Sequence, residues 1–176
     1  MSAPEIPGLL LTGATGAGKT AVAIEAGEQM STQGDPTAIV DLDWLCWLPG
    51  IPSPEIERLM LENLAAVWPR FRDRGARRLI VTRAVSRPNL VQAIRDETPD
   101  VRFTVVRIEA SVDTIQERLM RRDTGSELEA HLAEAYEWIR LMGETELDPI
   151  SVDNDGARSV REVAAELLRA VGWRPG

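Results

Sequence analysis

A short glycine-rich stretch near the start of the chain has the residue types needed to hold a phosphate group. The sequence GATGAGKT, residues 13–20, follows the apolar run GLLLT and fits the spacing G-x-x-x-x-G-K-[ST]. Glycines let the backbone wrap around a phosphate with N–H groups pointing inward, and the following helix N-terminus adds partial positive charge. The stretch predicts a phosphate-binding loop made of Gly13, Ala14, Thr15, Gly16, Ala17, Gly18, Lys19 and Thr20.

Lys19 is the only lysine among the 20 lysine and arginine residues of the chain. Its compact ammonium can reach the β- and γ-phosphates of a nucleotide, whereas the planar fork of arginine has a different shape. The neighbouring hydroxyl of Thr20 is a ligand suited to Mg²⁺. A single lysine among so many arginines indicates that this position requires the geometry of an ammonium group.

Two carboxylates lie at the end of the second apolar run, TAIVDLD, residues 37–43. If this run is a strand, Asp41 and Asp43 point to the same side, because side chains alternate along a strand. One carboxylate could organise Mg²⁺, and the other could orient or deprotonate an acceptor hydroxyl for attack on a γ-phosphate. The alternative is an acidic turn that is merely solvated.

Three arginines lie at helical spacing in the run SVDTIQERLMRR. Arg118, Arg121 and Arg122 are at positions i, i+3 and i+4, and therefore share one face of the expected helix. Such a cluster can clamp a transferring phosphoryl group and neutralise its developing charge. The alternative is a solvated basic face paired with Glu117 and Asp123.

Aromatic residues follow the acidic pair directly. Trp44 and Trp47 could form a flat wall for a ring or sugar face, or could equally pack in the core. Cys46, between them, has no partner in sequence that would stabilise a thiolate, so no catalytic role is expected. His131 is interpreted as a solvated helix residue. The remaining tryptophans are interpreted as core or helix-packing residues, namely Trp68, Trp138 and Trp173.

Length and composition indicate one domain spanning residues 1–176, with an ordinary globular balance of apolar and charged residues. The net charge of −8 makes a general nucleic-acid-binding surface unexpected. One cysteine and one histidine cannot build a His/Cys metal cluster. No apolar run is long enough to cross a bilayer and no signal-peptide pattern is present, so a cytoplasmic protein without membrane partners is expected.

Apolar runs alternate with helical patterns, which is typical of an α/β fold with a parallel sheet. Pro69 is expected to end or kink the second helix. The expected strands are residues 8–12, 37–43, 77–82, 101–108 and 148–153. The expected helices are residues 18–30, 54–68, 88–97, 111–122, 127–142 and 159–170.

Two nucleotide-hydrolysing classes are disfavoured by the sequence. The third strand ends in Arg83, where motor ATPases carry an acidic residue, and the N-K-x-D motif of GTPases is absent because there is no second lysine. The chain instead resembles the small P-loop kinases, on the basis of the phosphate loop, the D-x-D pair and the RLxxR helix. Gluconate, shikimate and adenylyl-sulfate kinases and chloramphenicol phosphotransferase are members of that group.

The resemblance implies a P-loop NTPase fold of three layers, with a five-stranded parallel sheet in the order 2-3-1-4-5 and helices on both faces. It further implies ATP and Mg²⁺ as cofactors, with Asp41 and Thr20 near the metal and Asp43 as candidate base for the acceptor hydroxyl. Arg118 and Arg122 would belong to a short lid at about residues 122–127 and touch the ATP phosphates.

The resemblance also extends to the rest of the site. The loop from Asn154 to Arg158 would lie against the adenine, and Arg83 would bind an anionic group of the acceptor. Asp41, Asp43, Trp44 and Arg83 form the expected acceptor side. The expected function is transfer of the γ-phosphate of ATP to a hydroxyl of a small metabolite, nucleoside or antibiotic. The alternatives are a catalytically degenerate nucleotide-binding module and a nucleoside monophosphate kinase.

Overall fold

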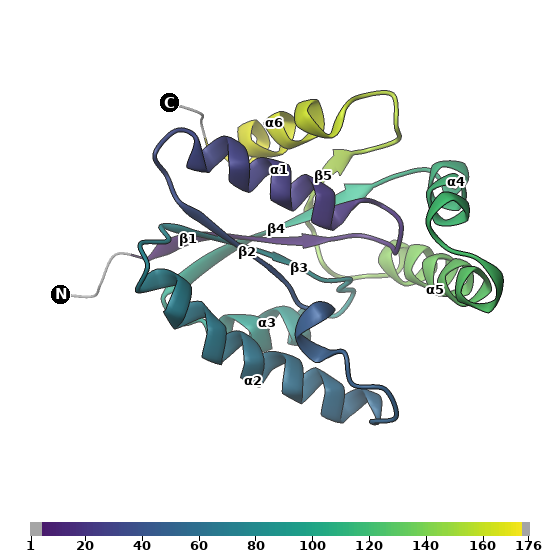
Figure 1. Ribbon diagram of the computed structural model, residues 1–176, viewed down its shortest axis with the longest axis horizontal. Helices are drawn as coiled ribbons and strands as arrows, with labels where there is room; N and C mark the ends of the chain where they lie inside the picture. Colours follow the sequence, from purple (N-terminus) through teal and green to yellow (C-terminus); the bar gives the residue numbers. More distant parts are fainter. Residues whose placement is uncertain (1–4, 174–176) are drawn as a thin grey trace.

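The expected strands form one parallel sheet in the computed structural model, which describes residues 5–173 (Figure 1). The order β2-β3-β1-β4-β5 confirms the order that the resemblance implied. The strands are β1 (Ile6–Thr12), β2 (Thr37–Asp41), β3 (Arg78–Thr82), β4 (Val101–Glu109) and β5 (Ile150–Asp153).

Strand β1 lies at the centre of the sheet because both of its faces are apolar. Leu9, Leu10 and Leu11 are fully buried, and Leu10 is in register with Val81 on one side and Val105 on the other. Continuous apolar runs are typical of parallel strands that are covered on both faces. Side chains alternate, so Leu10 joins one core cluster while Leu9 and Leu11 join the other.

Helices cover both faces, which confirms the three-layer arrangement (Figure 1). Helices α1 and α6 pack on one face and α2 and α3 on the other, while α4 and α5 lie beside the phosphate loop. The helices are α1 (Lys19–Ser31), a short 3₁₀ helix (Trp44–Cys46), α2 (Ser53–Arg72), α3 (Pro88–Glu97), α4 (Val112–Arg122), α5 (Gly125–Gly143) and α6 (Val160–Ala170).

Three local differences from the sequence-based expectations have physical causes. Strand β2 ends at Asp41, and Asp43 lies in the turn that leads into the 3₁₀ helix. Pro69 does not end α2, because it lies in the last turns and its own carbonyl still accepts the N–H of Asp73 at 2.9 Å. Helix α5 begins at Gly125, so only Asp123 and Thr124 separate it from α4.

None of the helices in residues 5–173 combines the length and the apolar character that a membrane span requires.

The core under α2 offers a direct test of this architecture. Leu64 is fully buried against the sheet, so Leu64→Ala is expected to lower the free energy of unfolding by about 2–5 kcal/mol. Leu48 is half exposed, and Leu48→Ala is the matched control, with an expected change within about 0.5 kcal/mol. Urea unfolding measures both variants, and equal stability losses would contradict the packing described above.

Candidate active site

The phosphate loop connects β1 to α1 and has the backbone that glycine permits. Gly13, Gly16 and Gly18 have positive φ angles of 146°, 85° and 94°. A Cβ at Gly13 would lie 2.4 Å from the carbonyl oxygen of Ile108, and one at Gly18 would lie 2.5 Å from Nδ2 of Asn154. Strain and crowding therefore both require glycine at the first and last of these positions.

Lys19 turns its ammonium back over the loop. Its Nζ donates to the carbonyl oxygens of Gly13 at 3.0 Å and Ala14 at 3.2 Å. Burial lowers the pKa of Lys19, and the nearby carboxylates of Asp43 and Asp41 act in the opposite direction. The ammonium is thus a positive charge held inside the loop by neutral carbonyls, where an anion can compete for it.

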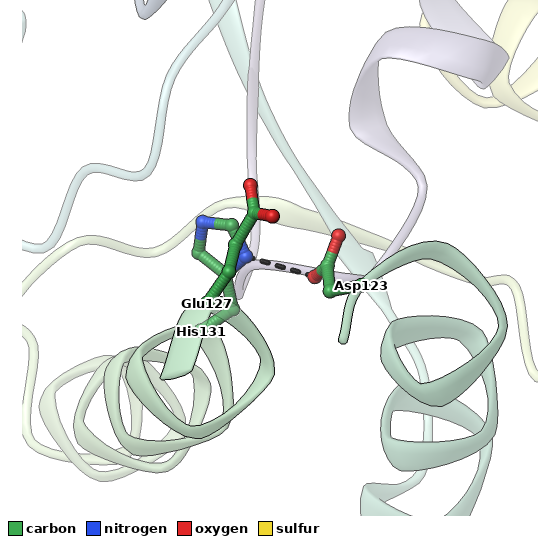
Figure 2. Close-up of side chains that lie close together, drawn as sticks. All are labelled: Asp123, Glu127 and His131. Atoms are coloured by element: carbon green, nitrogen blue, oxygen red, sulfur yellow. Dashed lines mark hydrogen bonds and ion pairs between the residues drawn. The ribbon is translucent and has the colours of Figure 1, made fainter. Parts of the chain in front are cut away.

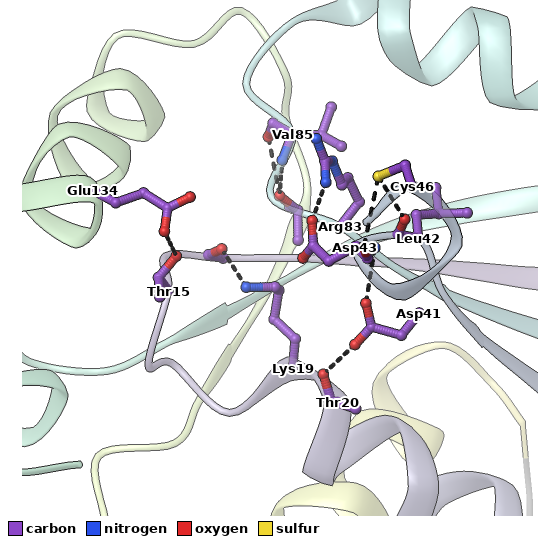
Figure 3. Close-up of polar contacts among 12 residues, drawn as sticks. Thr15, Lys19, Thr20, Asp41, Leu42, Asp43, Cys46, Arg83, Val85 and Glu134 are labelled. Carbon is purple, nitrogen blue, oxygen red and sulfur yellow. Dashed lines mark hydrogen bonds and ion pairs between the residues drawn. The ribbon is translucent and has the colours of Figure 1, made fainter. Parts of the chain in front are cut away.

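The Thr20 hydroxyl donates to Oδ2 of Asp41 at 2.6 Å (Figure 3). The other oxygen of Asp41 accepts the backbone N–H of Asp43 at 3.0 Å. This side-chain bond to a backbone two residues ahead bends the chain after β2. The predicted reason for the pairing of Asp41 and Asp43, alternation along one strand, is therefore wrong, although both side chains line the same cavity.

Arg83 follows β3 and forms an ion pair with Asp43 (Figure 3). The loop that carries Arg83 is fixed to β1, because Thr12 Oγ1 donates to the carbonyl of Val85 at 3.0 Å and accepts its N–H at 2.8 Å. The expected role of Arg83 was to bind an anionic group of the acceptor. In the structure its guanidinium pairs with the carboxylate of Asp43 at the cavity wall, and a contact with the acceptor stays a prediction.

Arg118 lies under the phosphate loop. Its guanidinium donates to the carbonyl oxygens of Ala17 at 3.2 Å and Asn154 at 2.7 Å, and burial lowers the pKa of Arg118. Asn154 is itself buried and donates to the same carbonyl of Ala17 at 2.8 Å. Arg118 also lines the cavity, where it could reach a nucleotide. Its contact with nucleotide phosphates stays a prediction.

Arg158, expected near the adenine, contacts other groups in the structure. It forms ion pairs with Glu166 and Asp153, and it donates to the backbone carbonyl of Asp153. The residues that line the cavity do not include Arg158 within the described part of the chain. Its proposed adenine contact, like that of Asn154, remains a prediction.

Arg122, Asp123 and His131 form a compact network where α4 meets α5, and Figure 2 shows its contact between Asp123 and His131. Arg122 Nε and Nη2 donate to the two oxygens of Asp123 at 2.7 and 2.9 Å, and His131 Nδ1 lies 2.8 Å from Oδ2. Arg122 is the main cause, with His131, of an Asp123 pKa lowered to about 2. His131 is therefore half-buried in a network at the cavity wall, and its interpretation as a solvated residue is wrong.

Asp123, Glu127 and His131 also offer ligand atoms that lie within 4.8 Å of one another (Figure 2). The guanidinium of Arg122 already occupies both oxygens of Asp123. A divalent cation would have to displace that charge, which disfavours a metal at this place.

Trp44 and Trp47 are 75% and 73% exposed, so packing in the core is excluded for both. Their ring centroids are 6.1 Å apart with an interplanar angle of 25°, and both rings line the cavity. Trp68 and Trp173 are buried, as expected. Trp138 packs against α4 and also reaches the cavity wall.

The side chains described above as cavity-lining surround one cavity of about 800 Å³, within the range of small-molecule sites. It extends from the phosphate loop to the ends of β2 and β3 and is closed on the far side by α5. Figure 3 shows Glu134 of α5 accepting the hydroxyl of Thr15 at 3.0 Å. The α5 residues of the wall were missed from the sequence, although their spacing on one helix face is a readable signal: Glu127, His131, Glu134 and Trp138.

A parallel α/β sheet with a phosphate loop after its central strand defines the class of P-loop nucleotide-binding folds. No protein-family model matches the chain, and no curated protein matches it in sequence. Solved structures do match it over nearly the whole length, and three of them are structures of kinases.

A sugar kinase from Janibacter sp. HTCC2649 is 18% identical, with a TM-score of 0.67, covering 98% of this chain and 97% of that one. A gluconokinase from Sinorhizobium meliloti 1021 is 19% identical, with a TM-score of 0.58 and coverages of 97% and 94%. The APS kinase of Mycobacterium tuberculosis, solved with AMPPNP and APS, is 18% identical, with a TM-score of 0.60 and coverages of 97% and 99%. The chain has the fold of these P-loop kinases, as the resemblance predicted.

The Arg122–Asp123–His131 network predicts a pH-dependent contribution to stability. Because folding lowers the pKa of Asp123 from 3.8 to about 2, the stabilisation is present above about pH 4 and is lost as the pH falls towards 2. Urea unfolding of the wild type and Asp123→Asn should therefore differ most near neutral pH and converge in acid. Glu129→Gln, at an exposed position of α5, is the control without such convergence. A wild-type advantage that persists unchanged in acid would contradict the network.

Proposed function

We propose that the protein is an ATP- and Mg²⁺-dependent phosphotransferase that moves the γ-phosphate of ATP to a hydroxyl of a small molecule. The observation that carries this proposal is the bond of 2.6 Å between Thr20 and Asp41, beside the single lysine of the phosphate loop. A hydroxyl oxygen and a carboxylate oxygen that lie side by side are a pair of ligands suited to Mg²⁺. The fold shared with three solved kinases supports the same reaction class.

The phosphate loop supplies the nucleotide site in this proposal. The backbone N–H groups of residues 13–20 and the N-terminus of α1 bind the phosphates, and Lys19 exchanges its loop carbonyls for phosphate oxygens. Thr20 and Asp41 would hold Mg²⁺, which when bound neutralises negative charge on the phosphate oxygens.

Asp43 is placed to act on the acceptor. It lies in the same cavity as the phosphate loop, and its ion pair with Arg83 fixes its orientation. In the proposed step the acceptor oxygen forms a bond to the γ-phosphorus, the bond to the bridging oxygen breaks, and ADP leaves. Asp43 accepts the acceptor's hydroxyl proton, which then passes to solvent.

Two arginines from α4 complete the proposed machinery. Arg118 lies against the loop carbonyls, and Arg122 lies at the cavity wall with its orientation set by Asp123. Fixed positive charges near the transferring group stabilise the charge that develops on it, since they need no reorganisation during the reaction.

The first test is ADP release from ATP with a panel of sugars, nucleosides, nucleotides, and aminoglycoside and phenicol antibiotics. Acceptor-stimulated release should depend on Mg²⁺ and fall at least about 100-fold in Lys19→Ala. Lys19→Arg keeps the charge but not the compact ammonium, and is expected to resemble Lys19→Ala. Arg95→Ala, at an exposed position of α3, is the control. Nucleotide binding without stimulated release would favour the nucleotide-binding module instead.

Asp43→Asn separates binding from turnover. The substitution removes the proton acceptor while leaving the phosphate loop intact, so kcat should fall by about 10²–10⁴-fold. The dissociation constant for ATP should stay within about threefold of the wild-type value. Asp73→Asn, an exposed carboxylate after α2, is the matched control. Full turnover by Asp43→Asn would show that Asp43 is not the base.

A further inference from the structure

The two tryptophans after Asp43 present an unusually exposed aromatic surface. Trp44 and Trp47 are among the most exposed large apolar side chains of residues 5–173, and their rings are nearly parallel. Exposed aromatic pairs of this kind are costly in water and are commonly used to bind flat or ring-shaped ligands. Both rings line the cavity that contains Asp43, so the pair adjoins the proposed point of phosphoryl transfer.

The backbone below the tryptophan pair is held firmly, although the rings are exposed. The Cys46 thiol donates to the carbonyl of Leu42 at 3.1 Å, and Leu45 donates its N–H to the same carbonyl at 3.2 Å. From α2, Asn63 donates to the carbonyl of Leu45 at 2.6 Å. These bonds fix the short helix that begins at Trp44 and ends just before Trp47, so the backbone that carries both rings is preorganised.

The charges of the cavity wall disfavour an anionic acceptor. Arg83 is paired with Asp43, and Arg122 is paired with Asp123. Among the described residues, no arginine or lysine lies within 4.0 Å of the carboxylate oxygens of Glu127 or Glu134, although both carboxylates help to raise the pKa of Arg122. Glu134 accepts a hydrogen bond from the hydroxyl of Thr15. Within residues 5–173, the whole cavity is lined by five carboxylates, Asp41, Asp43, Asp123, Glu127 and Glu134, and by four cationic side chains, Lys19, Arg83, Arg118 and Arg122. The lining is therefore slightly negative, and the two carboxylates of α5 lie at the same cavity as the aromatic faces, a combination that favours neutral or cationic rings.

We propose that the acceptor is a hydroxylated ring compound without an anionic group, held against the faces of Trp44 and Trp47 with its hydroxyl directed to Asp43. This inference rests on the proposed phosphotransferase function and deepens it by naming the acceptor class. It also reverses the expectation for Arg83, whose charge serves Asp43 rather than a phosphate, sulfate or carboxylate of the acceptor. The proposal predicts that nucleoside monophosphates and acidic sugars are not acceptors.

Binding, measured without turnover, tests the acceptor class. Protein saturated with Mg²⁺ and AMPPNP, which fills the nucleotide site, is titrated with matched compounds and followed by tryptophan fluorescence and calorimetry. The pairs are uridine and its monophosphate, phenyl glucoside and phenyl glucuronide, and glucosamine and glucuronate. The neutral or cationic member of at least one pair should bind with a dissociation constant below about 1 mM, and at least about tenfold more tightly than its anionic partner.

The tryptophan pair is tested by substitution. In the Trp44→Ala/Trp47→Ala double variant, the dissociation constant of the bound ring compound should rise at least about tenfold, while that of AMPPNP stays unchanged. The corresponding double phenylalanine variant should recover most of the affinity, because it restores an aromatic face. Leu48→Ala, exposed next to the pair but outside the cavity wall, is the matched control.

The outcomes distinguish this inference from the proposed function. Tighter binding of anionic members, unchanged ring binding in the double alanine variant, or no ring compound bound at about 10 mM would overturn the acceptor class. Each of these results leaves Lys19-dependent ADP release with some other acceptor possible. Ring binding that depends on the tryptophans, but with no ADP release from any acceptor, would overturn the phosphotransferase function and keep the ring subsite.

Discussion

The carbonyl groups of the phosphate loop impose the constraint on which the rest of the site depends. A loop that turns its N–H groups inward to bind an anion turns its carbonyls outward, and buried carbonyls require donors. Lys19 donates hydrogen bonds to the carbonyl groups of Gly13 and Ala14. Asn154 and Arg118 both donate to the carbonyl group of Ala17. Side chains from the end of β5 and from α4 thus hold a loop that lies far from them in sequence.

The same constraint explains why the loop could be predicted and its supports could not. Residues 13–20 carry their geometry in local residue types, because glycine at positive φ and a helix start are sequence-local features. The apolar runs likewise predicted all the strands and their surrounding helices to within a few residues. Asn154 gave no local sign of its contact with Ala17, which depends on how β5 is placed against β4.

At the carboxyl ends of β2 and β3, the sequence pointed to residues that line the cavity but not to how they are arranged. Asp43 was expected at a strand position, yet it is brought beside Asp41 by a turn that the carboxylate of Asp41 itself stabilises. His131 was misjudged because its partner, Asp123, lies across the connection between two helices. A tryptophan in a sequence can belong either to the core or to a cavity wall. For Trp44 and Trp47 only the fold could distinguish these two positions.

The lone lysine has a chemical consequence beyond phosphate binding. Lys19 carries the only side-chain amine in the chain, and burial shifts its pKa downward, towards the reactive free-base form. Acylating reagents and acetyl-transferring enzymes therefore have no lysine elsewhere on the surface to modify. Covalent labelling of a lysine in this protein is labelling of the phosphate loop itself, and a bound nucleotide would shield it.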